Sequence, residues 1–184
     1  SSIEPGNQKT PCPETQVNGF KLHIPQFYKR VYKLSDVVDV DYFVPGCPPA
    51  PHQVKAVLLA VAKGDLPPKG SVVGASELTV CDDCKRKKTE KKIKRFYRPF
   101  EIIQDPEKCL LEQGILCMGS ATRSGCGVRC PDSGMGCRGC YGPTANIVDH
   151  GVKFLSALAS IIDSKDPKEI QEIINGLPDF VSFP

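Results

Sequence analysis

Tryptophan is absent from this chain of 184 residues, and methionine occurs only twice. Long apolar runs are also absent: the longest covers residues 56–62, far short of the roughly 20 residues that a membrane-spanning helix needs. No segment has the pattern of a secretory signal peptide. We therefore expect no membrane span and a cytoplasmic location. Because that compartment is reducing, disulfides are disfavoured there and dense cysteine is better explained by metal binding.

Cysteine and glycine dominate the middle of the chain. Four cysteines are what a [4Fe-4S] cluster takes when every iron has a thiolate ligand, so eight cysteines make two complete sets. Glycines at positions 119, 125, 127, 134, 136 and 139 let the backbone come close to such a group. The stretch therefore predicts two iron–sulfur clusters and, with them, electron transfer. Its eight cysteines are Cys81, Cys84, Cys109, Cys117, Cys126, Cys130, Cys137 and Cys140.

Zinc binding and a disulfide-rich scaffold remain alternative explanations of these cysteines. The pairs Cys81/Cys84 and Cys137/Cys140 have the C-x2-C spacing of four-thiolate zinc sites. The other four cysteines are not arranged as pairs, which favours iron–sulfur clusters over zinc. A disulfide-rich scaffold would need an exported protein, and no export signal is visible.

A basic segment, residues 85–98, follows Cys84 directly and carries nine Lys or Arg and one Glu. Its charge of +8 leaves the rest of the chain at −5, since the whole chain has +3. The segment is a solvated surface, a nucleic-acid patch, or a surface that offsets cluster charge or docks an acidic electron-transfer partner. Its place beside Cys84 favours the last explanation over nucleic acid.

Hydrophobic periodicity predicts several elements in the first part of the chain. We expect a loop over residues 1–20, and a short helix within 20–34 from the spacing of Phe27, Val31 and Leu34. A β-branched and aromatic run predicts a buried strand over 37–45, followed by a helix over 54–64 that Gly64 ends. Strand, loop and helix form one α/β unit, and Cys47 follows its strand, where ligands bind in such sheets.

Two further helices are predicted near the end of the sequence. The first lies within residues 147–163, with an apolar stripe of Val148, Val152, Leu155 and Ile162, and with Leu158 and Ile161 beside it. The second begins after Asp166 as N-cap, with Pro167 at the first helical position and Glu169 at the third, and ends near Gly176. We expect both helices to support the cysteine-rich region.

The run CLLEQGILCMGSATRSGCGVRCPDSGMGCRGCYGP, together with VDYFVPGCPP upstream, resembles the small subunit of cytoplasmic [NiFe] hydrogenases. The resemblance is strongest to the archaeal methyl-viologen-reducing (deazaflavin-non-reducing) and sulfhydrogenase branch, and it covers nearly all of residues 10–184. It implies a non-catalytic, electron-relaying subunit. Members of the family carry proximal, medial and distal clusters in a line, between the nickel–iron site of a separate large subunit and an external acceptor.

The resemblance also assigns the cysteines to clusters. It implies that the distal [4Fe-4S] cluster takes Cys81, Cys84, Cys109 and Cys117, and that the medial [4Fe-4S] cluster takes Cys126, Cys130, Cys137 and Cys140. Many relatives have proline at the position of Cys130 and hold a three-iron medial cluster, so the cysteine here implies a full cubane. The resemblance further places Arg123 and Arg138 near the medial cluster, where they would neutralise charge and donate hydrogen bonds.

The proximal cluster is where the sequence departs from the family. Cys47 matches one proximal ligand, but the other proximal ligands of the family lie in a flavodoxin-like N-terminal half that this sequence does not contain. Cys12 lies in a Thr-Pro-Cys-Pro loop that resembles a stretch without ligands. A third cluster, and the choice between a fragment, a split subunit and a two-cluster protein, are left open by the sequence.

Together these features predict an α+β protein. Residues 1–70 would be the end of a flavodoxin-like α/β domain, and residues 71–184 an irregular, loop-rich iron–sulfur domain with C-terminal helices. The implied partners are the hydrogenase large subunit and an iron–sulfur or flavin acceptor subunit, such as one linked to heterodisulfide reductase, with no nucleic acid. His23, His52 and His150 have no partners at metal-ligand spacing, so we expect surface or packing roles. The rival functions are a zinc-stabilised nucleic-acid-binding module and a ferredoxin-like carrier without a large subunit.

Overall fold

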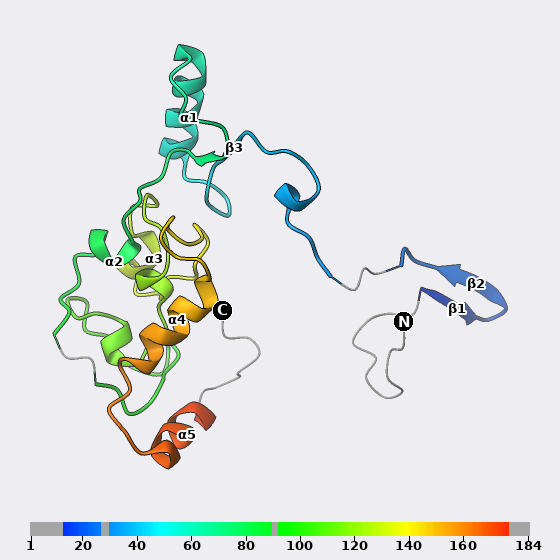
Figure 1. The fold of residues 1–184 in the computed structure, drawn as a ribbon. Coiled ribbons are helices and arrows are strands. Elements are labelled where there is room, and N and C mark those ends of the chain that lie inside the picture. Colours follow the sequence, from blue (N-terminus) through cyan, green and yellow to red (C-terminus); the bar gives the residue numbers. More distant parts are fainter. Residues whose placement is uncertain (1–12, 27–29, 90–91, 177–184) are drawn as a thin grey trace. The chain divides into compact units, whose positions relative to one another are not determined.

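Residues 13–26, 30–89 and 92–176 are described by the computed structural model of the chain (Figure 1). Contacts divide the chain into two units, residues 1–40 and 41–184. The boundary predicted between residues 70 and 71 falls inside the second unit, where Gly70 donates a backbone hydrogen bond to Asp41 at 2.7 Å. All nine described cysteines belong to the second unit.

The first unit contains a β-hairpin. Strands β1 (Glu14–Val17) and β2 (Phe20–His23) pair antiparallel, with Glu14 opposite His23 and Val17 opposite Phe20. Asn18 and Gly19 join them with φ angles of 51° and 81°, and an Asn-Gly pair with two positive φ angles is typical of a tight hairpin turn.

Two predictions for this first unit are wrong. The loop predicted up to residue 20 contains β1 and the turn, and the helix predicted within 20–34 begins instead with strand β2. Leu34 starts the 3-10 turn η1 (Leu34–Asp36), while Phe27 lies outside the described residues. The Asn-Gly turn accounts for β2, which takes residues 20–23 out of the predicted helix, and Val31 lies exposed in irregular structure.

A strand–helix–strand unit opens the second unit and confirms the predicted α/β element. Strand β3 (Tyr42–Phe43) pairs in parallel with β4 (Ser71–Val72), and helix α1 (Pro51–Lys63) connects them. The strand is shorter than the predicted 37–45, and the prediction that it is buried is wrong, since Val37, Val38 and Phe43 are exposed. The helix begins three residues earlier than predicted, after Pro48 and Pro49, and Gly64 ends it with a φ of 69° as expected.

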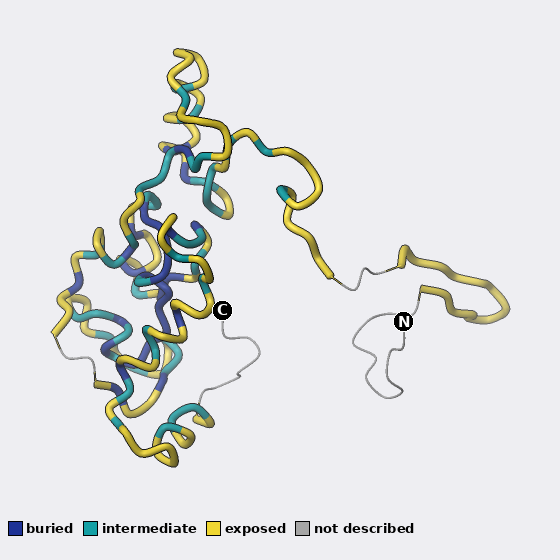
Figure 2. The backbone as a smooth tube through the Cα atoms, in the orientation of Figure 1, coloured by how far each residue is buried: buried dark blue, intermediate teal, exposed yellow. Residues whose placement is uncertain are grey.

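Helix α1 leaves most of its apolar side chains exposed, in contrast to the cysteine-rich region, where the buried residues gather (Figure 2). Val54, Leu58 and Val61, which are spaced as one apolar face of this helix, are all exposed, while Gln53 is almost completely buried. Among the described residues no helix is both long and apolar enough to cross a bilayer.

Loops and single turns make up the cysteine-rich region. Its short elements are α2 (Val80–Asp83), η2 (Leu111–Gln113), η3 (Met118–Ser120) and α3 (Arg129–Asp132). Isolated β-bridges connect segments that are distant in sequence, such as Lys87 with Lys108 and Tyr97 with Ile115. A core of Val80, Phe96, Leu110, Ile115 and Ala121 lies between these turns. Apolar burial around this core therefore holds the loops in place with little regular structure.

Helices α4 (His150–Ala159) and α5 (Pro167–Asn175) follow. Both were predicted, and Asp166 caps α5 by accepting from Lys168 N at 3.0 Å. The prediction for the apolar side chains of this helix is half right: Val148, Val152 and Leu155 of the stripe are exposed, whereas Leu158 and Ile161 beside it pack against the core. The helix also packs through Phe154, and Ile161 lies beyond its end. In a capping box, the side chain of the third helical residue, here Glu169, accepts a hydrogen bond from the N-cap amide. Here the Glu169 carboxylate accepts from the hydroxyl of Ser164 instead.

Candidate metal centre

The last four cysteines of the sequence lie around one small cavity of about 110 Å³. Cys126 precedes α3, Cys130 lies within it, and Cys137 and Cys140 follow it. Cys126 and Cys130 both raise the pKa of Cys140, so these sulfur atoms are within electrostatic reach of each other. The structure thus brings together the four residues predicted for the medial cluster.

A separate set, called the first group below, lies on α2 and the loops beside it and consists of Cys81, Cys84, Cys109 and Cys117; the four cysteines around the cavity are the second group. Cys81 lies in α2 and Cys84 at its C-cap, while Cys109 lies in a loop that Lys87 holds through a backbone hydrogen bond of 2.8 Å. Charges on Cys117, Cys109 and Cys84 all raise the pKa of Cys81. A Cβ atom on Gly119 would lie 3.2 Å from the sulfur of Cys81 and 3.5 Å from that of Cys117. Glycine is therefore the residue that fits between these two thiols.

Backbone N–H groups point at several of the sulfur atoms. Cys137 N donates to Cys117 Sγ at 3.2 Å, which joins the two cysteine groups directly. The N–H groups of Gly119 and Gly139 lower the pKa values of Cys117 and Cys137, respectively. Iron-bound thiolates take such hydrogen bonds, which stabilise their negative charge. The donor set and its surroundings therefore fit iron–sulfur clusters.

Burial is the main influence on the pKa values of these thiols. It raises the pKa of Cys81 to about 12 and that of Cys137 to about 11, and it also raises the pKa values of Cys117 and Cys140. A buried thiolate is costly without a neighbouring cation, because desolvation favours the neutral form. These thiols would therefore release their protons on binding a metal.

All nine described cysteines carry free thiols. Within the described ranges, no group of three or more His, Cys, Asp or Glu side chains is close enough together to hold a metal ion. The four ligands of a zinc ion all lie about 2.3 Å from it when they are thiolates. The ligands of a [4Fe-4S] cluster bind four different irons, so they stand further apart.

Cys47 lies four residues after β3 and is exposed. Its backbone N–H lowers the pKa of Cys140, so Cys47 is adjacent to the second cysteine group. The structure thus places the predicted proximal ligand beside the predicted medial set. Cys12 lies outside the described residues.

Several curated proteins are similar to this chain, although no family model matches it. An iron-sulfur subunit of the F420-non-reducing hydrogenase of Archaeoglobus profundus is 41% identical over 166 residues, which cover 88% of this chain and 51% of that protein. A subunit of the F420-non-reducing hydrogenase of Methanothermus fervidus is 41% identical over 105 residues, which cover 52% of this chain and 82% of that protein. The chain belongs to this family of hydrogenase subunits.

A more distant member of the same group is the delta chain of sulfhydrogenase 2 from Pyrococcus furiosus, which is 31% identical over 141 residues, 70% of this chain and 50% of that protein. The chain spans about half the length of most of the curated relatives it matches. These similarities confirm the resemblance to a hydrogenase electron-transfer subunit that the cysteine pattern predicted.

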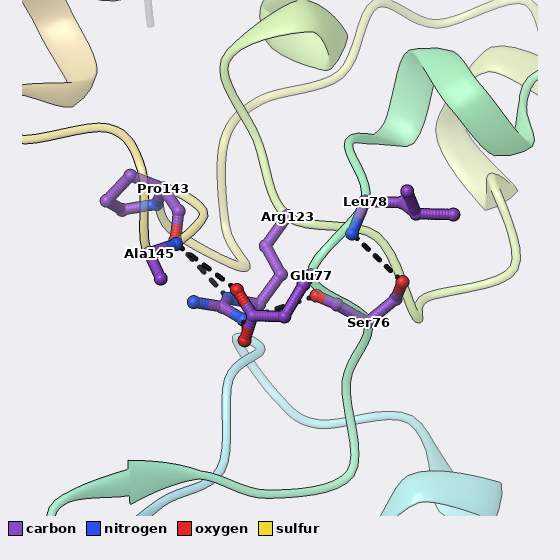
Figure 3. A network of polar contacts seen from close by, with 6 residues as sticks. All are labelled: Ser76, Glu77, Leu78, Arg123, Pro143 and Ala145. Carbon is purple, nitrogen blue, oxygen red and sulfur yellow. Dashed lines mark hydrogen bonds and ion pairs between the residues drawn. The ribbon is translucent and has the colours of Figure 1, made fainter.

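Arg123 of this hydrogenase-family chain connects three loops (Figure 3). Its side chain is 4% exposed, forms an ion pair with Glu77, and donates to the backbone oxygens of Ser76 at 3.2 Å and Pro143 at 3.3 Å. Arg123 lowers the pKa of Glu77, whose carboxylate also accepts from Ala145 N at 3.3 Å. In the described part of the chain no hydrogen bond joins Arg123 to a cysteine. Its predicted role beside the medial cluster therefore has no direct contact to support it.

Arg138 and two side chains that the sequence did not single out lie beside the cysteines. Arg138 lines the 110 Å³ cavity, as does Thr122. The Thr122 hydroxyl contacts His150 Nε2 at 3.1 Å and lowers the pKa of Cys137. Arg86, counted only as one charge of the basic segment, is buried and bonds to the residue after Cys130. Neither Thr122 nor Arg86 has a distinctive spacing, so sequence reasoning had no signal for them.

Glu77→Gln should lower the free energy of unfolding by about 1 kcal/mol. The substitution removes the ionic partner that the structure gives to the buried Arg123, and the exposure of Glu77 limits the loss. Urea unfolding of the anaerobically purified protein measures this change in the free energy of unfolding. Glu107→Gln is the matched control, because the ion pair of Lys87 and Glu107 is 70% exposed on both sides and should contribute about 0.5 kcal/mol or less. Equal losses in the two variants would contradict the anchoring role of Arg123.

Proposed function

We propose that this chain relays electrons through two [4Fe-4S] clusters as a subunit of a [NiFe] hydrogenase. The observation that carries the proposal is the pair of four-thiol groups, joined where Cys137 N donates to Cys117 Sγ. When bound, such clusters supply one-electron carriers at low potential. The distal cluster would be held by Cys81, Cys84, Cys109 and Cys117, and the medial cluster by Cys126, Cys130, Cys137 and Cys140.

The residues of this chain would bind and orient the clusters and would make no bonds to substrate. Eight thiols give up their protons to become ligands, and the N–H groups of Gly119, Cys137 and Gly139 stabilise the thiolates. Arg138 on the cavity wall adds positive charge beside the medial set. The buried core packs against the loops that carry the cysteines. This packing would keep the two cysteine groups at a fixed separation.

The partners follow from the two ends of this arrangement. We propose that electrons enter from the nickel–iron large subunit at the Cys47 side, where Cys47 would give one ligand to a proximal cluster. They would leave from the distal set, beside the basic segment, to an iron–sulfur or flavin acceptor subunit with an acidic surface, such as one linked to heterodisulfide reductase. Exposed Lys85, Lys87 and Lys88 of that segment supply the charge complementarity.

Location and fold complete the proposal. We place the complex in the cytoplasm, where a reducing environment keeps the thiols available for iron. We further propose that β3, α1 and β4 are the end of a flavodoxin-like α/β domain, and that the cysteine-rich region is a separate iron–sulfur fold. The parallel pairing of β3 with β4 across a helix supports the first part.

Anaerobic purification and assay of iron and acid-labile sulfide test this function. Two cubanes predict about eight iron atoms and about eight sulfides per chain, with the broad visible absorbance of iron–sulfur clusters. A colourless protein that contains zinc and no sulfide would contradict the proposal and favour the nucleic-acid-binding alternative. Co-purification with a nickel-containing protein would separate a hydrogenase subunit from a free ferredoxin-like carrier.

A further inference from the structure

Arg86 is a buried cation whose hydrogen bonds reach loops of both cysteine groups. Its side chain is 9% exposed, although arginine is rarely buried without a partner. The guanidinium donates four hydrogen bonds, all to backbone oxygens: two to Pro131, at 3.0 and 2.9 Å, one to Asp105 at 2.9 Å and one to Lys108 at 3.1 Å. These bonds satisfy four of its five N–H donors, but none of the acceptors carries a negative charge.

These acceptors place Arg86 beside loops that carry cysteines of both groups. Pro131 directly follows Cys130 of the second group, and Lys108 directly precedes Cys109 of the first. The backbone beside Arg86 is fixed as well, since Lys87 N donates to Glu107 O at 2.6 Å and Cys109 N donates to Lys87 O at 2.8 Å. Cys84, two residues before Arg86, completes the arrangement. A single side chain thus ties together loops that carry ligands of both proposed clusters.

No carboxylate forms an ion pair with Arg86 among the residues that the structure describes. Asp132 and Glu107 line the same surface groove as Arg86, but Arg86 takes only the backbone oxygen of Asp105 and forms no ion pair. Arg123, the other buried arginine, has Glu77 as its counter-charge. Burying an unpaired charge is costly, so a stable protein needs negative charge nearby. Groups of thiolates bound to iron carry negative charge, and Arg86 contacts the backbone directly beside one cysteine of each group.

We propose that Arg86 is a positioning residue that holds the two cysteine-bearing loops together and supplies the positive charge that raises the reduction potentials of both clusters. This inference rests on the proposed function, because it requires clusters in both groups. A nearby positive charge stabilises the reduced, more negative form of a cluster and so raises its potential, and net charge and hydrogen bonding are known determinants of cluster potential.

Redox titration of the anaerobically purified chain, followed by electron paramagnetic resonance, tests the inference. Arg86→Met should shift the midpoint potentials of both clusters to more negative values. Arg86→Lys keeps the positive charge but loses the planar set of donors. Its midpoint potentials should therefore lie closer to those of the unmodified chain than to those of Arg86→Met. Lys85→Met is the matched control: it removes a positive charge one residue away, but Lys85 is exposed and water screens it. The midpoint potentials of both clusters in Lys85→Met should stay close to those of the unmodified chain.

A second outcome is that Arg86→Met does not hold eight irons. Retention of both clusters by Arg86→Lys would then support the need for a buried positive charge. Loss of clusters in both variants would show that Arg86 is only a structural anchor, and would overturn the proposal that its charge raises the reduction potentials. Loaded variants with unshifted potentials would overturn it too, and leave the proposed function intact. An unmodified chain without iron and sulfide would overturn both.

Discussion

Gly136→Ala should prevent stable folding of the cysteine-rich region, at a cost of at least about 4 kcal/mol. A Cβ atom on this residue would lie 1.8 Å from the backbone oxygen of Leu116 and 2.9 Å from its carbonyl carbon. No side-chain rotation can relieve that overlap, because both atoms belong to the backbone. The loss is a large part of the stability of a typical domain.

The overlap also falls where the two cysteine groups meet. Directly after Gly136, Cys137 donates to Cys117 Sγ at 3.2 Å and accepts from Met118 N at 2.9 Å. Pushing these segments apart would break both hydrogen bonds. We therefore expect iron content to fall together with the midpoint of urea unfolding, measured by far-ultraviolet circular dichroism.

Gly151→Ala is the control for this substitution. Gly151 lies in helix α4, and its nearest neighbour would be Asp149 Oδ1 at 3.4 Å, an ordinary contact. Because alanine favours a helix over glycine by up to about 1 kcal/mol, we expect unchanged or slightly higher stability. A Gly136→Ala protein that unfolds at the same urea concentration as the unmodified chain would show that the close approach to Leu116 does not matter.

The sequence indicated the glycines and cysteines of this region, but not what each glycine does. Dense glycine beside cysteine predicted that the backbone comes close to something. Only the folded chain shows that Gly119 faces two thiols whereas Gly136 faces the backbone of Leu116. Such long-range contacts have no local pattern, and neither do the contacts of Arg86 with Pro131 and of Thr122 with His150.

Regular elements were predictable where capping residues and a helical pattern agreed. Gly64 and Asp166 both mark helix ends as expected. At the hairpin two local patterns conflict: Asn18-Gly19 favours a tight turn, whereas the spacing of the apolar residues after it favours a helix. For α4, apolar residues surround much of the helix, and periodicity alone could not tell that Phe154 would be buried and Val152 exposed.

Cys137→Ala should remove one cluster and leave the other, lowering iron from about eight to about four atoms per chain. Cys137 lies on the wall of the 110 Å³ cavity, and the loss of its thiolate leaves three ligands in the second group. Its backbone N–H, which donates to Cys117 Sγ, is unaffected by the substitution. The first group should therefore keep its geometry and its four irons.

Cys84→Ala provides the same test for the first group, and Cys47→Ala is the control for removing any cysteine. Cys47 is exposed and lies outside both groups of four, so its loss should leave about eight irons. Parallel iron and sulfide assays, with circular dichroism to verify folding, measure all three variants. Retention of eight irons by a folded Cys137→Ala protein would contradict its assignment as a ligand. A fall to four in Cys47→Ala would mean that Cys47 belongs to one of the two complete sets. Loss of all iron in both Cys84→Ala and Cys137→Ala would indicate that the two clusters assemble together, which the hydrogen bond between Cys137 and Cys117 would explain.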